Sequence, residues 1–281
     1  MLIPPIICYV NIVPTELVRY NDLSLVRNGS ETGLVRIAQK NMPQEVLEMK
    51  VEIWSDFVCP FCYIGKTKFE SALAQFAHKD KVEVIYKCFE LDPGKHPKQL
   101  TVTSLAKKYG MTAEKAKEMT QGVANQAAEI GLSFEFENQY NANTFDAHRL
   151  LLLAQKQNIA SDLVSILFAA HFTDNVDIED HAELIKLAVQ AGLSEEEAQG
   201  VLLSDQYASD VRADEQQASN LGISGVPFFV LNNKYAISGA QPQHVFLNAL
   251  EQTWAETNPT LVNIQGDDEV RLCGPDNCEI K

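Results

Sequence analysis

Two cysteines separated by two residues, in the motif Cys59-Pro60-Phe61-Cys62, give the sequence its clearest chemical signal. The motif lies between a predicted strand and a predicted helix, so Cys59 is expected at the N-terminus of that helix. Unpaired backbone N–H groups and the helix dipole favour a thiolate at this position. A thiolate can attack a disulfide to form a mixed disulfide, which a second thiol one turn further along then resolves. We therefore expect a catalytic dithiol in which Cys59 attacks and Cys62 resolves.

A proline at the head of another predicted strand, in Ser224-Gly225-Val226-Pro227-Phe228-Phe229, gives the second signal. Proline lacks the N–H that a strand ladder uses, so neighbouring backbone groups are left free to pair with an extended substrate. A trans proline at a strand start is the commoner case. In combination with the upstream dithiol, however, the motif favours a cis Val226–Pro227 bond and a substrate-binding role for Val226 and Pro227.

A second pair of cysteines, Cys273 and Cys278, encloses four residues that readily form turns. Such a loop can bring two sulfurs within bonding distance, which predicts a second redox pair; the alternative is a tail with two incidental thiols. The two cysteine pairs could also bind one zinc ion. We favour redox chemistry, because Cys59 and Cys62 open a helix inside a β-α-β pattern. The sequence accordingly predicts no metal and no cofactor.

The composition of the 281-residue chain narrows its partners and its location. The 23 Lys and Arg residues against 38 Asp and Glu residues give a net charge of −15, which repels the phosphates of nucleic acids. No apolar stretch reaches the roughly 18 residues that span a membrane, and the N-terminus lacks the basic start of a signal peptide. We therefore expect a cytoplasmic protein with neither nucleic-acid nor membrane partners. Disulfide-containing or dithiol proteins are the expected substrates.

Patterns of apolar residues predict the elements that hold these motifs. Strands are predicted at 51–54 and 82–86 with a helix between them, a β-α-β unit that implies parallel strands. From 100 to 221 the pattern is helical, with Ser194 and Glu197 as a capping box and Asp177 as a further cap. A hairpin over 227–231 and 235–238 precedes a final helix at 243–254. The fold class is therefore α/β with an inserted helical bundle.

Several residues are assigned to the core rather than to chemistry. Cys88 follows a strand and is expected to be a small buried apolar residue. His148 is a candidate site residue, but it lies in a densely apolar helix, where packing is the more frequent role of a histidine. Steps of three and four residues place five apolar residues on one helix face: Ala116, Met119, Val123, Ala127 and Ile130.

Three separated segments resemble the DsbA-like thioredoxin superfamily, and the FrnE-like branch is the most similar. They are residues 54–65 around the dithiol, residues 143–150, which read Asn-Thr-Phe-Asp-Ala-His-Arg-Leu, and the loop 225–227. The resemblance extends from about residue 49 to residue 254. It implies a thioredoxin-like fold with an inserted α-helical domain, in which Cys59 and Cys62 face a cis proline at Pro227. FrnE-like proteins sometimes carry a second C-x4-C pair, proposed to relay electrons with the first.

The patterns and the resemblance together divide the chain into four parts. Residues 49–99 and 222–257 are expected to form a discontinuous thioredoxin-like domain, and residues 100–221 a helical insertion. Residues 258–281 are expected to be a C-terminal tail with the second cysteine pair. Residues 1–48 are expected to be an N-terminal extension, because the first recognisable strand begins only at Met49, a candidate for the native start.

Two other classes of function stay open at this point. Kappa-class glutathione transferases and hydroxychromene carboxylate isomerases resemble this architecture. A glutathione-dependent isomerase or transferase is therefore the main alternative, with glutathione as its partner. Those relatives typically have serine where Cys59 stands, so the two cysteines favour a protein disulfide oxidoreductase or isomerase. A binding scaffold with structural cysteines is the third class.

Phe61 departs from the strongly oxidising DsbA proteins, which carry a histidine at this place. An imidazolium stabilises a neighbouring thiolate and with it the reduced form, whereas a phenyl ring does not. Together with Pro60, Phe61 is therefore expected to tune the couple toward a less oxidising potential. Replacing Phe61 with His should raise the reduction potential by about 30 mV or more, measured by equilibration with glutathione buffers. An unchanged or lower potential would contradict this account.

Overall fold

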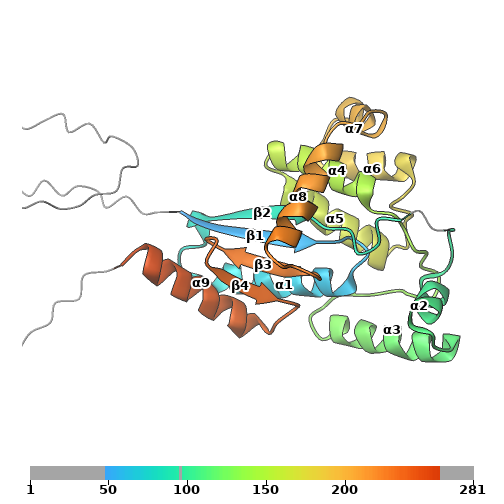
Figure 1. Cartoon of the computed structure of the whole chain (residues 1–281), viewed down its shortest axis with the longest axis horizontal. Coiled ribbons are helices and arrows are strands. Elements are labelled where there is room, and N and C mark those ends of the chain that lie inside the picture. The colour runs from blue at the N-terminus through green and yellow to red at the C-terminus, as the bar shows by residue number, and fades with distance from the viewer. Residues whose placement is uncertain (1–47, 95–96, 260–281) are drawn as a thin grey trace, which may run out of the picture. The chain divides into compact units, whose positions relative to one another are not determined.

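The computed structural model describes residues 48–94 and 97–259 of the chain (Figure 1). The predictions for the N-terminal extension, for the C-terminal tail and for Cys273 and Cys278 fall outside these residues, apart from Glu48, Asn258 and Pro259. In chain order the described elements are β1 (Met49–Ser55), α1 (Pro60–Gln75), η1 (Lys79–Lys81), β2 (Val82–Cys88), α2 (Thr101–Tyr109), α3 (Ala113–Ala128), α4 (Phe145–Lys156), α5 (Ala160–Phe172), α6 (His181–Ala191), α7 (Glu195–Leu202), α8 (Ala208–Asn220), β3 (Phe228–Leu231), β4 (Tyr235–Ser238) and α9 (Gln243–Thr257).

The sheet has the strand order β2-β1-β3-β4, with β1 at its centre. Strand β1 runs parallel to β2, in a register that pairs Met49 with Val82, and antiparallel to β3. The parallel β-α-β unit and the antiparallel hairpin of β3 and β4 are both confirmed. At the hairpin turn Asn232 and Asn233 have φ angles of 47° and 54°, a conformation that asparagine tolerates better than most residues.

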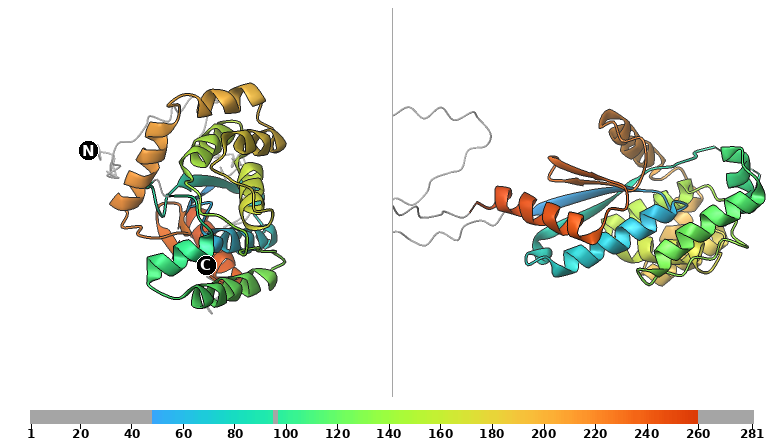
Figure 2. Two further views of the ribbon diagram at one scale, coloured as in Figure 1. Left: turned by 90° about the vertical axis from the view of Figure 1, so that its right-hand side faces the viewer. Right: turned by 90° about the horizontal axis from the view of Figure 1, so that it is seen from below.

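Each face of the sheet is covered by its own helices (Figure 2). On one side α1 and α9 pack together and against the strands, and Phe229 of β3 contacts Phe69 of α1 and Phe246 of α9. On the other side the fully buried Trp54 packs with Ala218 of α8. Because successive strand residues point to opposite faces, β1 contributes to both layers and has no exposed face.

The outer edge of β2 is closed by side chains from the helices that follow it. Gln155 of α4 accepts a hydrogen bond from the Tyr86 N–H at 3.0 Å, and Asp214 of α8 accepts one from the Cys88 N–H at 3.0 Å. These donors would otherwise be available to pair with a strand from another molecule. The helices between β2 and β3 therefore complete the sheet edge as well as packing on it.

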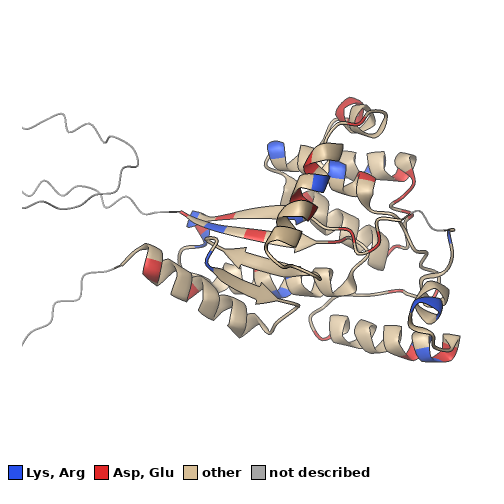
Figure 3. Cartoon of the chain, in the orientation of Figure 1, with Lys and Arg blue, Asp and Glu red and all other residues tan. Residues whose placement is uncertain are grey.

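Helices α2 and α3 lie side by side next to the N-terminal end of α1 (Figures 1 and 2). The charged residues of α3 are confined to its N-terminal part, from Glu114 to Glu118, and none follows up to Ala128 (Figure 3). Ala116 and Ala127 are buried as predicted, but Met119 is 38% exposed. The apolar face of α3 is thus only partly covered by the rest of the described chain.

Of the two predicted helix N-caps, one is confirmed and one is wrong. Ser194 and Glu197 form the expected capping box at the start of α7. The residue that caps α6 is Asp180, whose side chain accepts from the Glu183 N–H, and not Asp177. Asp177 instead accepts from the Glu179 N–H and pairs with Lys98, because it lies in the turn before the helix.

The division into a thioredoxin-like domain and a helical insertion stays a prediction. Helices α4 and α8 of the predicted insertion contact β2 of the predicted domain, and the described residues 48–94 and 97–259 fall in one compact unit. Within the described residues, no helix combines the length and apolar character needed to cross a bilayer.

Asp214 provides a test of how much the closed edge contributes to stability. Its carboxylate accepts from the Cys88 N–H and pairs with Lys87, and both partners are largely buried. Replacing Asp214 with Ala should lower the free energy of unfolding by about 2 to 3 kcal/mol in urea titrations, because a buried N–H and an ammonium lose their partner. The exposed Asp210 of the same helix is the control, and its replacement with Ala should cost less than about 1 kcal/mol. Equal losses in the two variants would contradict this role.

Candidate active site

Cys59 is the N-cap residue of α1, directly after the loop that leaves β1. Pro60 begins the helix, where its missing N–H and fixed φ angle cost nothing. No side chain caps the helix, so its first N–H groups and its dipole are directed toward the region of the Cys59 sulfur. Cys59 is only 5% exposed, and it forms no disulfide with Cys62. This is the geometry that stabilises a thiolate at a helix start.

Cys62 lies one turn further along α1 and is 1% exposed. Burial raises the pKa of the Cys62 thiol well above its usual value, and the neighbouring Cys59 raises it further. The backbone N–H of Asp56 donates to the Cys62 sulfur at 3.5 Å, which acts in the opposite direction. Cys62 is therefore held as a protonated thiol beneath the more accessible Cys59.

The loop before β3 lies opposite the dithiol. The Val226–Pro227 peptide bond is cis, as the resemblance implied, and the Val226 carbonyl accepts a hydrogen bond from the Cys59 thiol at 3.6 Å. Gly65 of α1 makes this approach possible, because a Cβ atom there would lie 2.9 Å from Cγ of Pro227. The structure thus brings together four predicted site residues from two distant segments, namely Cys59, Cys62, Val226 and Pro227.

The other predicted site residues fall into two groups. Pro60 and Phe61 lie beside Cys59 in the first turn of α1, and the Phe61 ring is 41% exposed. Their tuning role stays a prediction, as does a relay through Cys273 and Cys278, which lie outside the described residues.

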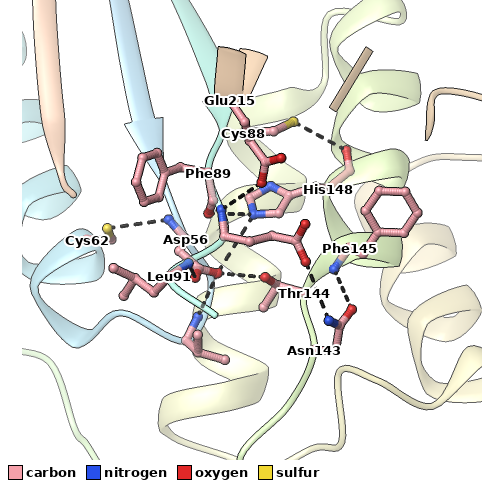
Figure 4. A network of polar contacts seen from close by, with 12 residues as sticks. Asp56, Cys62, Cys88, Phe89, Leu91, Asn143, Thr144, Phe145, His148 and Glu215 are labelled. Atoms are coloured by element: carbon pink, nitrogen blue, oxygen red, sulfur yellow. Dashed lines mark hydrogen bonds and ion pairs between the residues drawn. The ribbon is translucent and has the colours of Figure 1, made fainter. Parts of the chain in front are cut away.

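Asp56 holds the loop between β1 and Cys59 in place (Figure 4). Its carboxylate is 1% exposed and accepts hydrogen bonds from the Thr144 hydroxyl at 2.8 Å and from the Leu91 N–H at 2.7 Å. Figure 4 shows the two ends of this residue in different directions, the N–H toward Cys62 and the carboxylate toward α4. The hydrogen bond from Thr144 therefore helps to fix the Asp56 N–H, which donates to the Cys62 sulfur.

His148 lies beside this carboxylate but belongs to the packing. Its ring contacts the Phe57 ring in a tilted arrangement, with centroids 4.8 Å apart, and its Nε2 lies 3.2 Å from the Phe89 carbonyl and 3.7 Å from the Asp56 carboxylate. The predicted burial of His148 and of Cys88 is confirmed. Within the described part of the chain, no group of three or more His, Cys, Asp or Glu side chains is arranged to hold a metal ion.

An open pocket of about 600 Å³ adjoins Cys59 and is walled by α2, α3 and the loops around residues 91 and 141. Sequence reasoning did not identify this pocket or the role of Asp56 and Thr144. Asp56 and Thr144 lie in two of the segments that carry the family resemblance. Their position as polar residues in those segments could have indicated a role in the site. No comparable signal marked the pocket, because Met119 and Val123 were assigned to a buried face.

Comparisons with known proteins agree with this fold. A probable DsbA oxidoreductase from Streptomyces coelicolor is 43% identical over 83% of this chain and all of that chain, with a TM-score of 0.72. The uncharacterized protein YwbO from Bacillus subtilis is 28% identical over 209 residues, which are 73% of this chain and 96% of that protein. A 2-hydroxychromene-2-carboxylate isomerase is 15% identical over 74% of this chain and 97% of that one, with a TM-score of 0.55, a likeness of fold alone.

The family assignment rests on a match to most of the chain. The model of the DSBA-like thioredoxin domain matches residues 50–251, from the start of β1 into α9. This range includes the dithiol, the cis-proline loop and all the helices between them. The chain therefore belongs to the DSBA-like thioredoxin domain family.

Proposed function

We propose that the chain is a thiol-disulfide oxidoreductase that acts on protein disulfides through Cys59 and Cys62. The observation that carries the proposal is the pairing of two different sulfurs in one helical turn. Cys59 lies at the helix start and lines an open pocket, whereas Cys62 is buried and protonated. An attacking group needs access and a resolving group needs proximity, so the arrangement fits the two steps of disulfide exchange.

In the proposed reaction the Cys59 thiolate attacks one sulfur of a substrate disulfide. A Cys59–substrate disulfide forms, the substrate S–S bond breaks, and the second substrate sulfur leaves as a thiolate that takes up a proton. Cys62 then loses its proton and attacks the Cys59 sulfur, which forms the Cys59–Cys62 disulfide and releases the first substrate thiol. Two electrons pass from the dithiol to the substrate, and the same steps in reverse oxidise a substrate dithiol.

The Val226–Pro227 loop is proposed to hold the substrate during this exchange. The Val226 carbonyl is directed at the Cys59 thiol, so an extended substrate segment that pairs with this loop would bring its disulfide to the same sulfur. Asp56 is proposed as a positioning residue, because its carboxylate is anchored by Thr144 and Leu91 while its N–H faces Cys62.

The main alternative is a glutathione-dependent isomerase or transferase. The 2-hydroxychromene-2-carboxylate isomerase shares the fold, which is consistent with this class of enzyme. Such chemistry needs one nucleophile or none, and it gives no role to a buried second thiol one turn below the first. Turnover that survives the loss of Cys62 and requires glutathione would favour this alternative.

Single serine variants separate the two proposed roles. Cys59→Ser should reduce the rate of insulin disulfide reduction by about a thousandfold or more, because a hydroxyl at neutral pH is a far weaker nucleophile than a thiolate. Cys62→Ser should still attack and should accumulate the mixed disulfide, detected as a mass adduct on the intact protein. Cys88→Ser is the control at a buried cysteine away from the pair and should keep the wild-type rate. Full turnover by Cys59→Ser would refute the proposal.

The raised pKa of Cys62 predicts how the second step depends on pH. Burial, its largest cause, persists in the mixed disulfide, so Cys62 stays mostly protonated at neutral pH. The thiolate fraction, and with it the rate of resolution, should grow about tenfold for each pH unit between about pH 6 and 8. The measurement is the first-order release of a fluorescent thiol preloaded on Cys59. A rate that is independent of pH over this range would contradict the assigned protonation state.

A further inference from the structure

A three-residue segment after β2, from Phe89 to Leu91, contacts the site at both of its ends. The Phe89 carbonyl accepts a hydrogen bond from Nε2 of His148 at 3.2 Å, and the Leu91 N–H donates to the Asp56 carboxylate at 2.7 Å (Figure 4). Asp56 in turn donates its own N–H to the Cys62 sulfur. A contact that fixes this segment therefore also helps to fix the donor that faces the resolving thiol.

Glu90, the middle residue of the segment, is held by partners from two other parts of the chain. Its side chain is 1% exposed and forms an ion pair with Arg212 of α8. Asn143, in the loop before α4, donates to the same carboxylate at 3.5 Å. The Glu90 N–H donates to the Glu215 carboxylate of α8 at 3.3 Å. Both the backbone and the side chain of Glu90 are thus attached to α8, which leaves the segment little freedom to shift.

The guanidinium of Arg212 is itself held in place. Its central carbon lies 4.5 Å from the centroid of the Phe145 ring, and its Nη1 pairs with the Glu215 carboxylate at 2.7 Å. The Arg212 side chain is 49% exposed, so it reaches the buried Glu90 from the surface. A guanidinium that lies over a ring and contacts two carboxylates has few alternative positions.

The Glu90 carboxylate depends on Arg212 for its charge. Burial raises the pKa of Glu90 above its usual value, and the hydrogen bond and charge of Arg212 oppose this rise. Glu215 raises the pKa further, and His148 lowers it, each by a smaller amount. Without Arg212, Glu90 would either take up a proton or move toward water, because a buried unpaired carboxylate is costly. In both cases the segment would lose its side-chain attachment to α8.

We propose that Glu90 and Arg212 act as a positioning pair for the step in which Cys62 resolves the mixed disulfide. The inference rests on the proposed function and adds two residues that act on Cys62 through others. The pair keeps Leu91 where its N–H holds the Asp56 carboxylate. The Asp56 N–H then stabilises the negative charge that Cys62 gains when it loses its proton.

The attacking step should not depend on this pair. The Cys59 thiol contacts the Val226 carbonyl, and the start of α1 stabilises its thiolate. Loss of the ion pair should therefore separate the two steps: resolution slows, while attack keeps its rate.

Single-turnover kinetics of the full-length protein test the proposal. A fluorescent thiol is loaded on Cys59 at acidic pH, and its first-order release is recorded after a jump to values between pH 6 and 8. Glu90→Gln should slow the release about fivefold at pH 7 and displace the whole pH profile upward by about 0.7 pH unit, because a smaller fraction of Cys62 is then thiolate at each pH. Arg212→Met, a change at a half-exposed side chain, should have the same effect.

Three comparisons separate positioning from a general loss of structure. The double variant of Glu90→Gln and Arg212→Met should be no slower than either single variant, because both changes break the same contact. Glu52→Gln is the matched control, since Glu52 of β1 is likewise buried and paired with a half-exposed cation, Lys50, and it should keep the release rate within about twofold. In Cys62→Ser protein, Glu90→Gln should leave the second-order rate of attack on hydroxyethyl disulfide unchanged.

The outcomes that would overturn the proposal are distinct. A release rate within about twofold of the wild type in either single variant would overturn it, and so would an equal loss in Glu52→Gln or in the rate of attack. A double variant that combines both single losses would show that the two residues act independently, which would reject the pair. If Cys62→Ser accumulates no mixed disulfide, the proposed function itself fails, whatever the Glu90 and Arg212 variants show.

Discussion

Strand β1 is the constraint on which the rest of the structure depends. It is hydrogen-bonded to β2 on one side and to β3 on the other, and helices cover both of its faces. The end of β1 therefore has little freedom, and four residues later Cys59 forms the N-cap of α1. The same central position brings the start of β3, and with it Val226, next to that sulfur. The chemistry of the site thus follows from one strand that is fixed on every side.

The elements of the sheet were predictable because their signals are local. The β-branched Val and Ile residues of β1 and β2 favour strands, and Pro60 after Cys59 marks a helix start. The cap of α6 was assigned wrongly because Asp177 and Asp180 are equally good caps in sequence, and only the backbone of the intervening turn decides between them. Long-range contacts such as Gln155 to the edge of β2 leave no local pattern.

The candidate site divides in the same way. Cys59, Cys62 and Pro227 were identified from spacing and residue type. Two cysteines separated by two residues at a predicted helix start indicate disulfide exchange, and a proline at a predicted strand start is recognisable in the sequence. The hydrogen bond that anchors Asp56 comes from Thr144, which is 88 residues away in the sequence. A contact over this separation cannot be predicted from the spacing of residues in one chain segment. The pocket depends on an incompletely covered helix face: periodicity predicts that Met119 and Val123 are apolar neighbours on α3, but it does not say whether another element packs over them.

The distance along the chain between the two halves of the site has a consequence for its biosynthesis. Val226 follows Cys59 by 167 residues, and β3 is a direct neighbour of β1, so both reach the ribosome exit long after the cysteines. During that interval the nascent chain carries two thiols that lack the loop opposite them. An adduct formed on Cys59 at this stage would occupy the space into which Val226 and Pro227 must later close. Correct assembly therefore requires that Cys59 carry no external adduct until β3 has been made.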